Sequence, residues 1–387
     1  RSVAERYGFV EIRTPIVEKT ALFTRTIGAA TAIVEKEMYT FADQSEESLT
    51  LRPEGTAPVV RAYVESEAAQ HDPIAKYYYL GPMFRRERPQ KGRYRQFHQF
   101  GVESLGALHP YADVEAIALL LSFLGDVGLT RLRLEINSLG CTTCRPGYLQ
   151  MLSRMVAKVG AELCADCRRR ATQNPLRLFD CKNPDCQKVL AELPTITEYL
   201  CNPCRNHFAA VTHGLDSVAI SYVHNPRIAR GLDYYVRTAF EVIAEGLGAQ
   251  NAIGGGGRYD GLVKHLGGPD VPGIGFAVGL ERVMLLCQER AAAMKKTRTF
   301  VAAIGEAARA QVLTWIERWR RGGCAVEWDI DGRSLKSQMR RADKIGAAKV
   351  IIIGDEELKT GKAIVRDMLT KTQHAVPFDD LPSTVQS

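Results

Sequence analysis

The chain has 387 residues, of which 45% are hydrophobic and 25% charged, an ordinary composition for a soluble globular protein. This length exceeds one compact core, so we expect two or three domains. The formal net charge of +7 permits an anionic partner, although it serves solubility equally well. No apolar run reaches the roughly 20 residues that span a bilayer, so no membrane association is expected.

The chain opens with "RSVAERYGFVEIRTP", which predicts a helix followed by a strand rather than a secretory leader. It begins inside an element and without Met, so we expect an N-terminal piece to be missing. A large chain without a leader is predicted to be cytoplasmic, where stable disulfides are unexpected.

The first 138 residues mix helices and strands. A strand signal in "YGFVEIRTPIV" breaks at Pro15, and "LTLRPEGTAPVVRAYVES" predicts a strand, a turn and a helix that starts near Pro58. Two β segments follow, Lys76–Glu87 and Tyr94–Gly106, joined by a strongly basic turn. An amphipathic helix over 109–129 and an alternating strand over 131–140 complete this part.

From about residue 140 to 220 the pattern becomes helical and rich in cysteine, which predicts an inserted domain. Eight cysteines form four close pairs: Cys141/Cys144, Cys164/Cys167, Cys181/Cys186 and Cys201/Cys204. Because C-x-x-C lets two thiolates reach one tetrahedral ion, these pairs favour zinc over disulfides or free thiols. Eight ligands make two four-thiolate sites, or one site plus spare thiols, and the spacing leaves the pairing open.

Strand signals return at 217–245 and are followed by a glycine-rich hairpin that contains Gly254–Gly257, then by a helix within 278–293. A lysine-rich stretch, Ala291–Thr299, reads as a linker. Beyond it, strands alternate with helices at about 306–322 and 334–345, which predicts a small α/β domain. The expected division is therefore 1–138, 139–220, 221–293 and 298–387.

Charged side chains interrupt the two β segments beside the basic turn. Alternation puts Arg85 and Glu87 on one face, and Phe97, Gln99, Gly101 and Glu103 also share a face. Burying such charge is costly unless something pairs with it, so these residues form either a salt-bridge network or a site for a small molecule with a phosphate. G-x-x-x-x-G-K-[ST] is absent from the chain, and no G-x-G-x-x-G sits between a strand and a helix. If ATP binds, it binds on an antiparallel sheet through arginines.

Six stretches, spread over nearly the whole chain and including the residues just described, resemble histidyl-tRNA synthetase, a family of class II aminoacyl-tRNA synthetases. "YGFVEIRTPIVEKTALFTRTIG", "FRRERPQKGRYRQFHQFGVE" and "GIGFAVGLERVML" look like class motifs 1, 2 and 3. "RGLDYYVRTAFE" and "GGGGRYDGLV" look like the two more specific histidine signatures, and "GRSLKSQMRRADKIGA" resembles the anticodon-binding domain. The resemblance implies an α+β fold: an antiparallel catalytic sheet flanked by helices, a helical insertion and a C-terminal α/β domain.

The same resemblance implies ATP-dependent ligation of L-histidine to tRNA(His) by a cytoplasmic homodimer, with Mg²⁺ entering beside ATP. Arg85 and Arg230 are the expected catalytic residues. The expected ATP-binding residues are Arg85, Glu87, Arg93, Phe97 and Arg282. The expected histidine-binding residues are Glu54, Gly55, Thr56, Arg85, Gln99, Glu103, Arg230, Tyr234, Tyr235 and Tyr259. The expected tRNA contacts are Gln90, Lys91, Arg340 and Arg341.

The main alternative is a synthetase-like regulatory subunit, of the ATP phosphoribosyltransferase type, that binds histidine without charging tRNA. Such paralogues resemble only the catalytic core and tend to have degraded signatures, whereas this chain keeps its arginines and a C-terminal domain. A nucleic-acid-binding module does not explain the carboxylates Glu54 and Glu103, which would be counterproductive in a phosphate-binding groove. Nothing outside the cysteines supports a redox or metal-sensing protein. The paired cysteines are not a general family feature, so we expect one or two structural zinc ions that stabilise the insertion.

Overall fold

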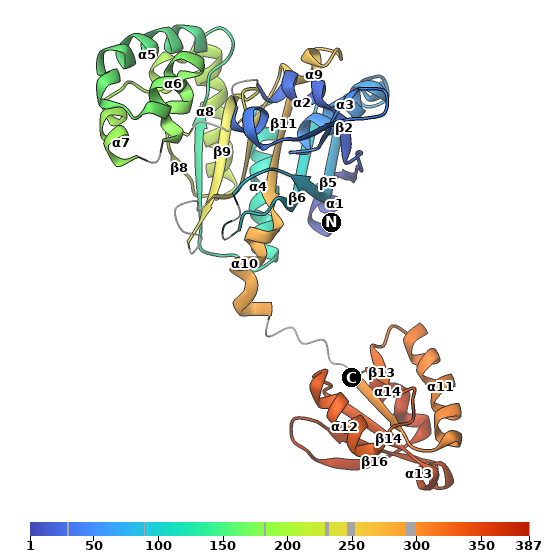
Figure 1. The fold of residues 1–387 in the computed structure, drawn as a ribbon. Coiled ribbons are helices and arrows are strands. Elements are labelled where there is room, and N and C mark those ends of the chain that lie inside the picture. Colours follow the sequence, from blue (N-terminus) through green and yellow to red (C-terminus); the bar gives the residue numbers. More distant parts are fainter. Residues whose placement is uncertain are drawn as a thin grey trace. The chain divides into compact units, whose positions relative to one another are not determined.

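The computed structural model describes residues 1–28, 31–88, 90, 92–181, 183–228, 232–245, 252–291 and 299–386. The chain forms two compact units, Arg1–Gln288 and Glu289–Ser387. The first unit contains a large mixed sheet with helices and a cysteine-rich helical group, and the second is a smaller α/β body (Figure 1). Within the described residues, every helix is too short or too polar to cross a membrane.

The large sheet has eight strands in the order β1-β5-β6-β11-β10-β9-β7-β8. Its six central strands pair antiparallel, and only the two-residue edge strands β1 and β8 pair in parallel. The strands are β1 (Val10–Glu11), β5 (Ala75–Phe84), β6 (Gln96–Leu105), β7 (Leu132–Ser138), β8 (Val223–His224), β9 (Val236–Ala244), β10 (Ala252–Arg258) and β11 (Gly273–Gly279). The two predicted β segments are thus present, and each is shorter than expected at the end near the turn.

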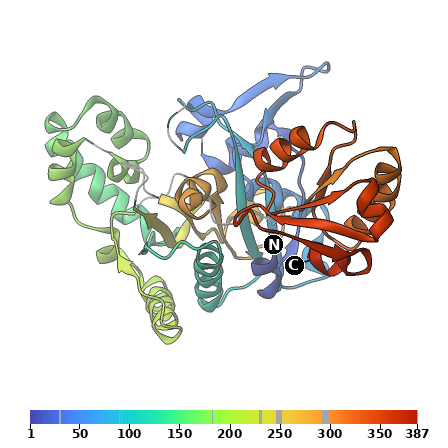
Figure 2. The ribbon, with the colours of Figure 1, turned by 90° about the horizontal axis from the view of Figure 1, so that it is seen from below.

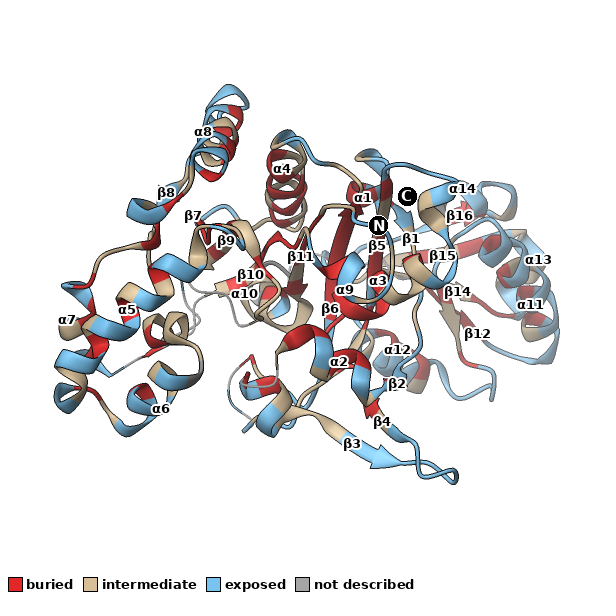
Figure 3. Ribbon diagram, turned by 90° about the horizontal axis from the view of Figure 1, so that it is seen from above, coloured by how far each residue is buried: buried red, intermediate tan, exposed pale blue. Residues whose placement is uncertain are grey.

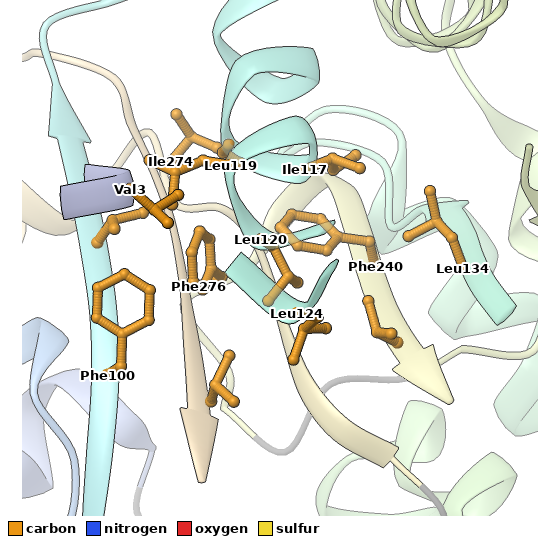
Figure 4. Close-up of a cluster of buried hydrophobic side chains, with 14 of the residues drawn as sticks. Val3, Phe100, Ile117, Leu119, Leu120, Leu124, Leu134, Phe240, Ile274 and Phe276 are labelled. Atoms are coloured by element: carbon orange, nitrogen blue, oxygen red, sulfur yellow. The ribbon is translucent and has the colours of Figure 1, made fainter. Parts of the chain in front are cut away.

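Helix α4 (Tyr111–Asp126) covers one face of this sheet. Figure 4 shows Ile117, Leu120 and Leu124 of α4 pointing at the aromatic rings of Phe276 and Phe240. Strand side chains alternate, so the even-numbered residues of β6 join this core while the odd-numbered residues face the other way. The opposite face of the sheet therefore remains available for a site.

A second, three-stranded sheet has the order β2-β4-β3, and helix α2 packs against it, whereas α1 packs against the core of the large sheet. Its β3–β4 hairpin extends away from the large sheet (Figures 2 and 3). The elements are α1 (Ser2–Arg6), β2 (Val17–Lys19), α2 (Thr20–Ile27), η1 (Ile33–Glu37), β3 (Tyr39–Ala42), β4 (Ser48–Leu51), α3 (Thr56–Glu65) and η2 (Ala68–Gln70). Helix α3 begins at Thr56, two residues before the predicted Pro58, because the Glu54 carboxylate accepts the N–H groups of its first turn.

The cysteine-rich region is helical, as predicted, and its helices α5–α7 group together beside β8 and β9 (Figure 1). It has a core of its own, in which the thiols of Cys167, Cys181, Cys186 and Cys204 are buried among leucines. The elements are α5 (Arg145–Val159), η3 (Gly160–Glu162), α6 (Ala165–Gln173), η4 (Pro175–Asp180), α7 (Pro184–Ala191), η5 (Ile196–Tyr199) and α8 (Asn202–Ser217).

The predicted glycine-rich hairpin is present as the antiparallel pairs that β10 forms with β9 and with β11. Gly254–Gly257 lie inside strand β10, and β10 joins β11 through residues 259–272, which include α9 (Leu262–His265), rather than through a tight turn. The glycines are needed in the strand because a Cβ on Gly256 would lie 2.0 Å from the Gly275 carbonyl oxygen. After β11 the chain enters α10 (Leu280–Ala291), and the rest of the predicted linker, 292–298, lies outside the described residues.

The second unit has a five-stranded sheet of order β13-β12-β14-β15-β16, parallel on one side and antiparallel on the other. The predicted strands and helices are present, but the hairpin β15–β16 and helix α13 were not predicted. The elements are β12 (Thr299–Ala303), α11 (Glu306–Arg321), β13 (Val326–Trp328), α12 (Leu335–Lys344), β14 (Lys349–Ile353), α13 (Asp355–Thr360), β15 (Lys362–Asp367), β16 (Gln373–Pro377), η6 (Phe378–Asp380) and α14 (Leu381–Gln386).

A fully buried ion pair joins the large sheet to its helices. Arg258, at the end of β10, donates from Nε and Nη2 to the carboxylate of Asp113 in α4, and both side chains are 0% exposed. His207 of α8 lies 3.2 Å from the same carboxylate. Burial alone would raise the pKa of Asp113, but the His207 contact and the Arg258 charge lower it below its usual value. The carboxylate therefore connects one strand and two helices.

We expect Asp113→Ala to destabilise the first unit by about 3–5 kcal/mol, because it leaves the Arg258 guanidinium buried without its partner. Asp126→Ala on the same helix is the matched control. It removes an ion pair with Arg6 whose side chains are 59% and 51% exposed, so a loss below about 1 kcal/mol is expected. Urea unfolding of both variants measures the difference, and equal losses would contradict the role given to burial.

Candidate active site

A cavity of about 250 Å³ lies on the sheet face opposite α4. Its walls come from β6, β10, β11, the connection between β5 and β6, and the segment after residue 231. Ten of the predicted site residues line it together: Glu54, Thr56, Arg85, Glu87, Arg93, Phe97, Gln99, Tyr234, Tyr235 and Arg282. The alternation seen in the sequence thus brings the odd-numbered residues of the two strands to one surface.

Three arginines lie at one end of the cavity near the carboxylate of Glu87. Arg93 Nη1 lies 3.0 Å from Glu87 Oε2, and Arg85 Nη1 lies 3.9 Å from Glu87 Oε1. Arg282 donates to the carbonyl oxygens of Gly92 and Ala252. Burial and the charge of Arg93 lower the pKa of Arg282, so the arginines at this end lie close enough to repel one another and an anion between them would relieve that repulsion.

The ring of Phe97 lies beside these arginines. The guanidinium carbon of Arg85 is 5.4 Å from the ring centroid, within the range of a cation–π contact. Arg85 is further oriented by its Nε–H, which donates to the Pro53 carbonyl oxygen at 2.9 Å. Phe97 and Arg282 both line the cavity. Their positions fit the prediction that a flat ring binds between them.

The other end of the cavity is polar and only partly charged. The two oxygens of Glu54 accept the backbone N–H groups of Thr56 and Ala57, each at 2.8 Å, which fixes the carboxylate at the start of α3. The hydroxyl of Tyr234 lies 3.5 Å from Glu54 Oε2. Burial raises the pKa of Glu54, and the two backbone donors oppose that rise. A carboxylate has further lone pairs, so Glu54 can still accept from a ligand.

Glu103 is fully buried beneath this end instead of lining the wall. Its Oε1 accepts from Thr56 Oγ1 at 2.6 Å and from the Tyr79 hydroxyl at 3.4 Å, and its Oε2 accepts from Tyr259. Burial raises the pKa of Glu103 to about 8. Gly55 and Tyr259 are also buried and are not among the described wall residues, and Tyr259 contacts the cavity region through its bond to Glu103.

Gln99 offers an acceptor that nothing in the described chain uses. Its Oε1 atom is buried and has no hydrogen-bond partner, although the residue lines the cavity. Since an unsatisfied buried acceptor costs roughly 1–3 kcal/mol, a ligand N–H at this position would recover that loss.

Several predicted residues lie away from the cavity or outside the described chain. Arg230 and Lys91 are outside the described residues. Gln90 is exposed, and its backbone pairs with that of Arg93 across the turn. Arg340 and Arg341 are exposed on α12 in the second unit, where Arg341 Nη2 lies 3.8 Å from Glu327 Oε2.

The sequence analysis missed Tyr79, which supports Glu103 from β5. Tyr79 pairs with Gly101 in the sheet register, and a Cβ on Gly101 or Gly55 would lie 2.2–2.3 Å from its ring. The sequence did contain a signal for Tyr79: strand alternation puts this odd-numbered residue on the same face as Arg85. Also missed as wall residues were Gly92, Tyr94, Leu232, Ala252, Ile253, Ala277, Gly279 and Glu281.

The eight paired cysteines form two clusters of four thiols. The first cysteine cluster is Cys141, Cys144, Cys201 and Cys204; the second is Cys164, Cys167, Cys181 and Cys186. In each cluster the sulfur atoms all lie within 4.8 Å of one another, and all eight are free thiols. The fold therefore resolves the pairing that spacing left open: each cluster could hold one metal ion.

Backbone donors stabilise negative charge in both clusters. The Thr143 N–H donates to Cys141 Sγ at 3.4 Å, and the Cys164 N–H donates to Cys186 Sγ at 3.2 Å. Burial opposes ionisation of Cys141, but N–H donors from Cys144 and Thr143 lower its pKa to about 6. Thiolate is the form that binds metals, so these contacts suit cation ligation.

We expect the free energy of unfolding of the wild-type protein to fall, relative to that of the Glu103→Gln variant, as pH rises. The raised pKa of Glu103 means that the folded state binds a proton more tightly than the unfolded state, whose carboxyl has a pKa near 4.5. The stabilising contribution of the protonated form is complete below about pH 4.5 and is lost by about pH 8, at roughly 1.4 kcal/mol per pH unit. Urea unfolding of both proteins from pH 5 to 9 measures this, and parallel pH profiles would disprove the assignment.

Comparisons with known proteins identify the family. A family model described as histidyl-tRNA synthetase matches residues 1–143 and 168–283, and one described as anticodon binding domain matches residues 299–387. A "Histidine--tRNA ligase" from Trichlorobacter lovleyi is 52% identical over 98% of this chain and 90% of its own length.

Solved structures agree. The apo histidyl-tRNA synthetase of S. aureus matches with a TM-score of 0.80 at 36% identity, covering 100% of this chain and 93% of that one. A structure titled ATP phosphoribosyltransferase regulatory subunit/histidyl-tRNA synthetase, from Bacillus halodurans C, shares the fold alone: its TM-score is 0.64 at 22% identity, covering 91% of each chain. From the family models and the identity along its whole length, the chain belongs to the histidyl-tRNA synthetase family, a class II aminoacyl-tRNA synthetase.

Proposed function

We propose that the chain ligates L-histidine to tRNA(His) in two steps, through a histidyl-adenylate intermediate. The observation that carries this proposal is the joint arrangement of the cavity: three convergent arginines at one end and a fixed carboxylate, two tyrosines and an unsatisfied amide oxygen at the other. Such a cavity accepts an anion and a small polar amino acid at once. Whole-length identity of about half to histidine–tRNA ligases supports the same reaction.

The arginine end takes ATP. Arg85 holds the α-phosphate and the carboxylate of the amino acid, since its planar guanidinium can donate to two oxygens at once. Arg93, Glu87 and Arg282 bind the nucleotide, and Phe97 stacks on adenine. Mg²⁺ enters with ATP and neutralises phosphate charge when bound.

The polar end takes histidine. Glu54 and Thr56 bind the α-amino group, and the Gln99 carbonyl oxygen accepts an imidazole N–H. Neutral imidazole has one donor and one acceptor, so Tyr234 and Tyr235 complete a pocket that pairs both. Glu103 and Tyr259 act from the layer beneath, where they hold Thr56 in place. An amino acid that lacks this pattern leaves buried polar groups unpaired, which discriminates by roughly 10⁴ or more.

Activation is an in-line attack of the histidine carboxylate on the α-phosphorus, which releases pyrophosphate. The nucleophile is already ionised, so this step needs no general base. What accelerates it is fixed positive charge where negative charge accumulates, supplied by Arg85 and Arg230. The second step transfers the histidyl group to the 3′-terminal ribose of tRNA and releases AMP.

tRNA contacts complete the proposal. Gln90 and Lys91 in the basic turn meet the acceptor end, and Arg340 and Arg341 meet the anticodon region. The functional parts are 1–138 and 221–293 for the catalytic core, 139–220 for the insertion and 298–387 for the anticodon-binding domain.

We further propose a homodimer in the cytoplasm; exposed apolar side chains near the N-terminus, at Val10, Ile16 and Val17, support a dimer contact there.

We also propose that each cysteine cluster holds one structural zinc ion. Four sulfurs bound to tetrahedral zinc at about 2.3 Å lie about 3.8 Å from each other. Cys141 Sγ is 3.8 Å from both Cys144 Sγ and Cys201 Sγ, and Cys144 Sγ is 3.9 Å from Cys204 Sγ, which supports this ion. In the second cluster, Cys164 Sγ is 4.0 Å from Cys181 Sγ.

The synthetase proposal predicts histidine-dependent exchange of labelled pyrophosphate into ATP. Arg85→Ala should lower the exchange rate by about 10² or more, because it removes fixed charge at the reacting phosphate. Arg86→Ala is the matched control, since Arg86 is the next residue, is exposed and is not part of the cavity wall. Histidine binding without any exchange by the wild-type protein would favour the regulatory-subunit alternative instead.

The zinc proposal predicts two zinc ions per chain in reduced protein purified without chelator. Cys141→Ser and Cys164→Ser should each lower the content to one, because each removes a ligand from a different cluster. Cys287→Ser is the control, since Cys287 lies outside both clusters and donates to the Val127 carbonyl oxygen. Elemental analysis decides, and less than about half an equivalent in the wild type would refute the proposal.

A further inference from the structure

Both cysteine clusters attach to the same short piece of the active site. The signature segment, Asp233–Tyr235, supplies two tyrosines to the cavity wall. Contacts from the cysteine-rich region hold this segment at both of its ends, and those contacts have no part in the reaction described above. Figure 1 shows the helices of that region beside the sheet.

The second cysteine cluster reaches Asp233. Its two cysteine pairs enclose α6 and η4, so an ion bound there would close the loop that contains Asn174 and Arg177. Asn174 Nδ2 donates to Asp233 Oδ1 at 2.9 Å, and Arg177 Nη2 donates to the same oxygen at 3.1 Å. The Arg177 side chain is only 13% exposed, so this is a partly buried, charge-assisted contact.

The first cysteine cluster reaches Tyr235. Arg145 follows Cys144 directly, and it donates from Nε to the Leu139 carbonyl oxygen and from Nη2 to the Tyr235 carbonyl oxygen. Arg237, two residues further on, exchanges backbone hydrogen bonds of 2.7 Å with Leu139 and Gly140, just before Cys141. The backbone at the end of the signature segment is therefore bonded to the residues that begin this cluster.

Between these two anchors the segment faces the amino-acid end of the cavity. The Tyr234 hydroxyl lies 3.5 Å from Glu54, and the Tyr235 ring lines the wall. The Asp233 N–H donates to the Ile27 carbonyl oxygen at the end of α2, and a Cβ on Gly28 would meet the Asp233 carboxylate at 2.2 Å. Asp233 is thus held on one side by α2 and on the other by Asn174 and Arg177.

Metal binding matters here because the ligand cysteines form part of the buried core of the region and come from separate helices and turns. Four of the buried side chains in this core are cysteines of the two clusters. Loss of a bound ion would leave their thiols in the core without the bonds that join them. An ion that joins Cys164/Cys167 to Cys181/Cys186 restricts the intervening chain, as closing a loop does.

We propose that zinc in the second cysteine cluster positions the histidine pocket, by fixing Arg177 and Asn174 against Asp233 and so orienting Tyr234 and Tyr235. Arg177 is a positioning residue that acts through Asp233. This inference rests on the proposed function, because it assigns the tyrosines to histidine. It predicts that metal occupancy sets the affinity for histidine while leaving the ATP end unaffected.

The test is steady-state pyrophosphate exchange with the full chain, titrating histidine and ATP separately. Arg177→Ala should raise the KM for histidine by about tenfold or more while the KM for ATP stays within about twofold. Arg177→Lys, which keeps the charge beside Asp233, should recover part of the loss. Arg227→Ala is the matched control: Arg227 also joins the cysteine-rich region to the rest of the unit, through the Leu190 and Ala191 carbonyl oxygens, but does not touch Asp233.

Removal of the second ion should have the same effect. Cys186→Ser should raise the KM for histidine as Arg177→Ala does, and the two changes combined should cost no more than either alone, because they act on one contact. If Cys186→Ser fails to fold, calorimetric titration of histidine and ATP into chelator-treated wild-type protein makes the same comparison.

The outcomes separate the two proposals. A wild-type protein without histidine-dependent exchange would reject the proposed function itself. Exchange with an unchanged KM for histidine in Arg177→Ala, or equal rises in the two KM values, would overturn the positioning role. Unchanged histidine affinity after loss of the second ion would overturn the role of the metal.

Discussion

The buried ion pair between Arg258 and Asp113 sets the position of the active-site floor. Arg258 ends β10 and points at α4, and the next residue, Tyr259, points to the opposite face and donates to Glu103. Consecutive side chains of an extended chain project in opposite directions, so fixing the first direction fixes the second. The contact with α4 therefore helps to fix Tyr259, one of the three donors that hold the Glu103 carboxylate beneath the polar end of the cavity.

The glycine run in β10 shows why one sequence feature can have two causes. Glycines suggest close approach of backbone to a ligand, and Gly254 and Gly255 do line the cavity. Gly257, however, is required by the sheet, since its Cβ would lie 2.6 Å from the Thr238 carbonyl oxygen. A run of four identical residues gave no means of separating the two requirements, because the difference depends on which strands flank β10.

Sequence reasoning succeeded where local alternation or a specific motif decided the answer. The period of two put Arg85, Phe97 and Gln99 on one face, and the cavity contains all three. It did not predict how deeply a side chain on that face is buried. Glu103 shares that face but lies under Thr56 and Tyr79, and only the packing of α3 against the sheet determines this. The grouping of cysteines 60 residues apart likewise depends on how the starts of α5 and α8 come together, which no spacing encodes.

The two ends of the cavity consequently differ in how they are held. The arginine end comes largely from the connection between β5 and β6 and from the start of β6, with Arg282 from α10 joined to that connection through Gly92. The polar end, where we propose that histidine binds, combines the start of α3, the middle of β6 and a segment anchored by the cysteine-rich region. More independent elements must be ordered to form it, and each adds an entropic cost. On the proposed assignment, histidine recognition is therefore more sensitive to changes far from the cavity than nucleotide binding, which depends mainly on the connection between β5 and β6 and on the start of β6.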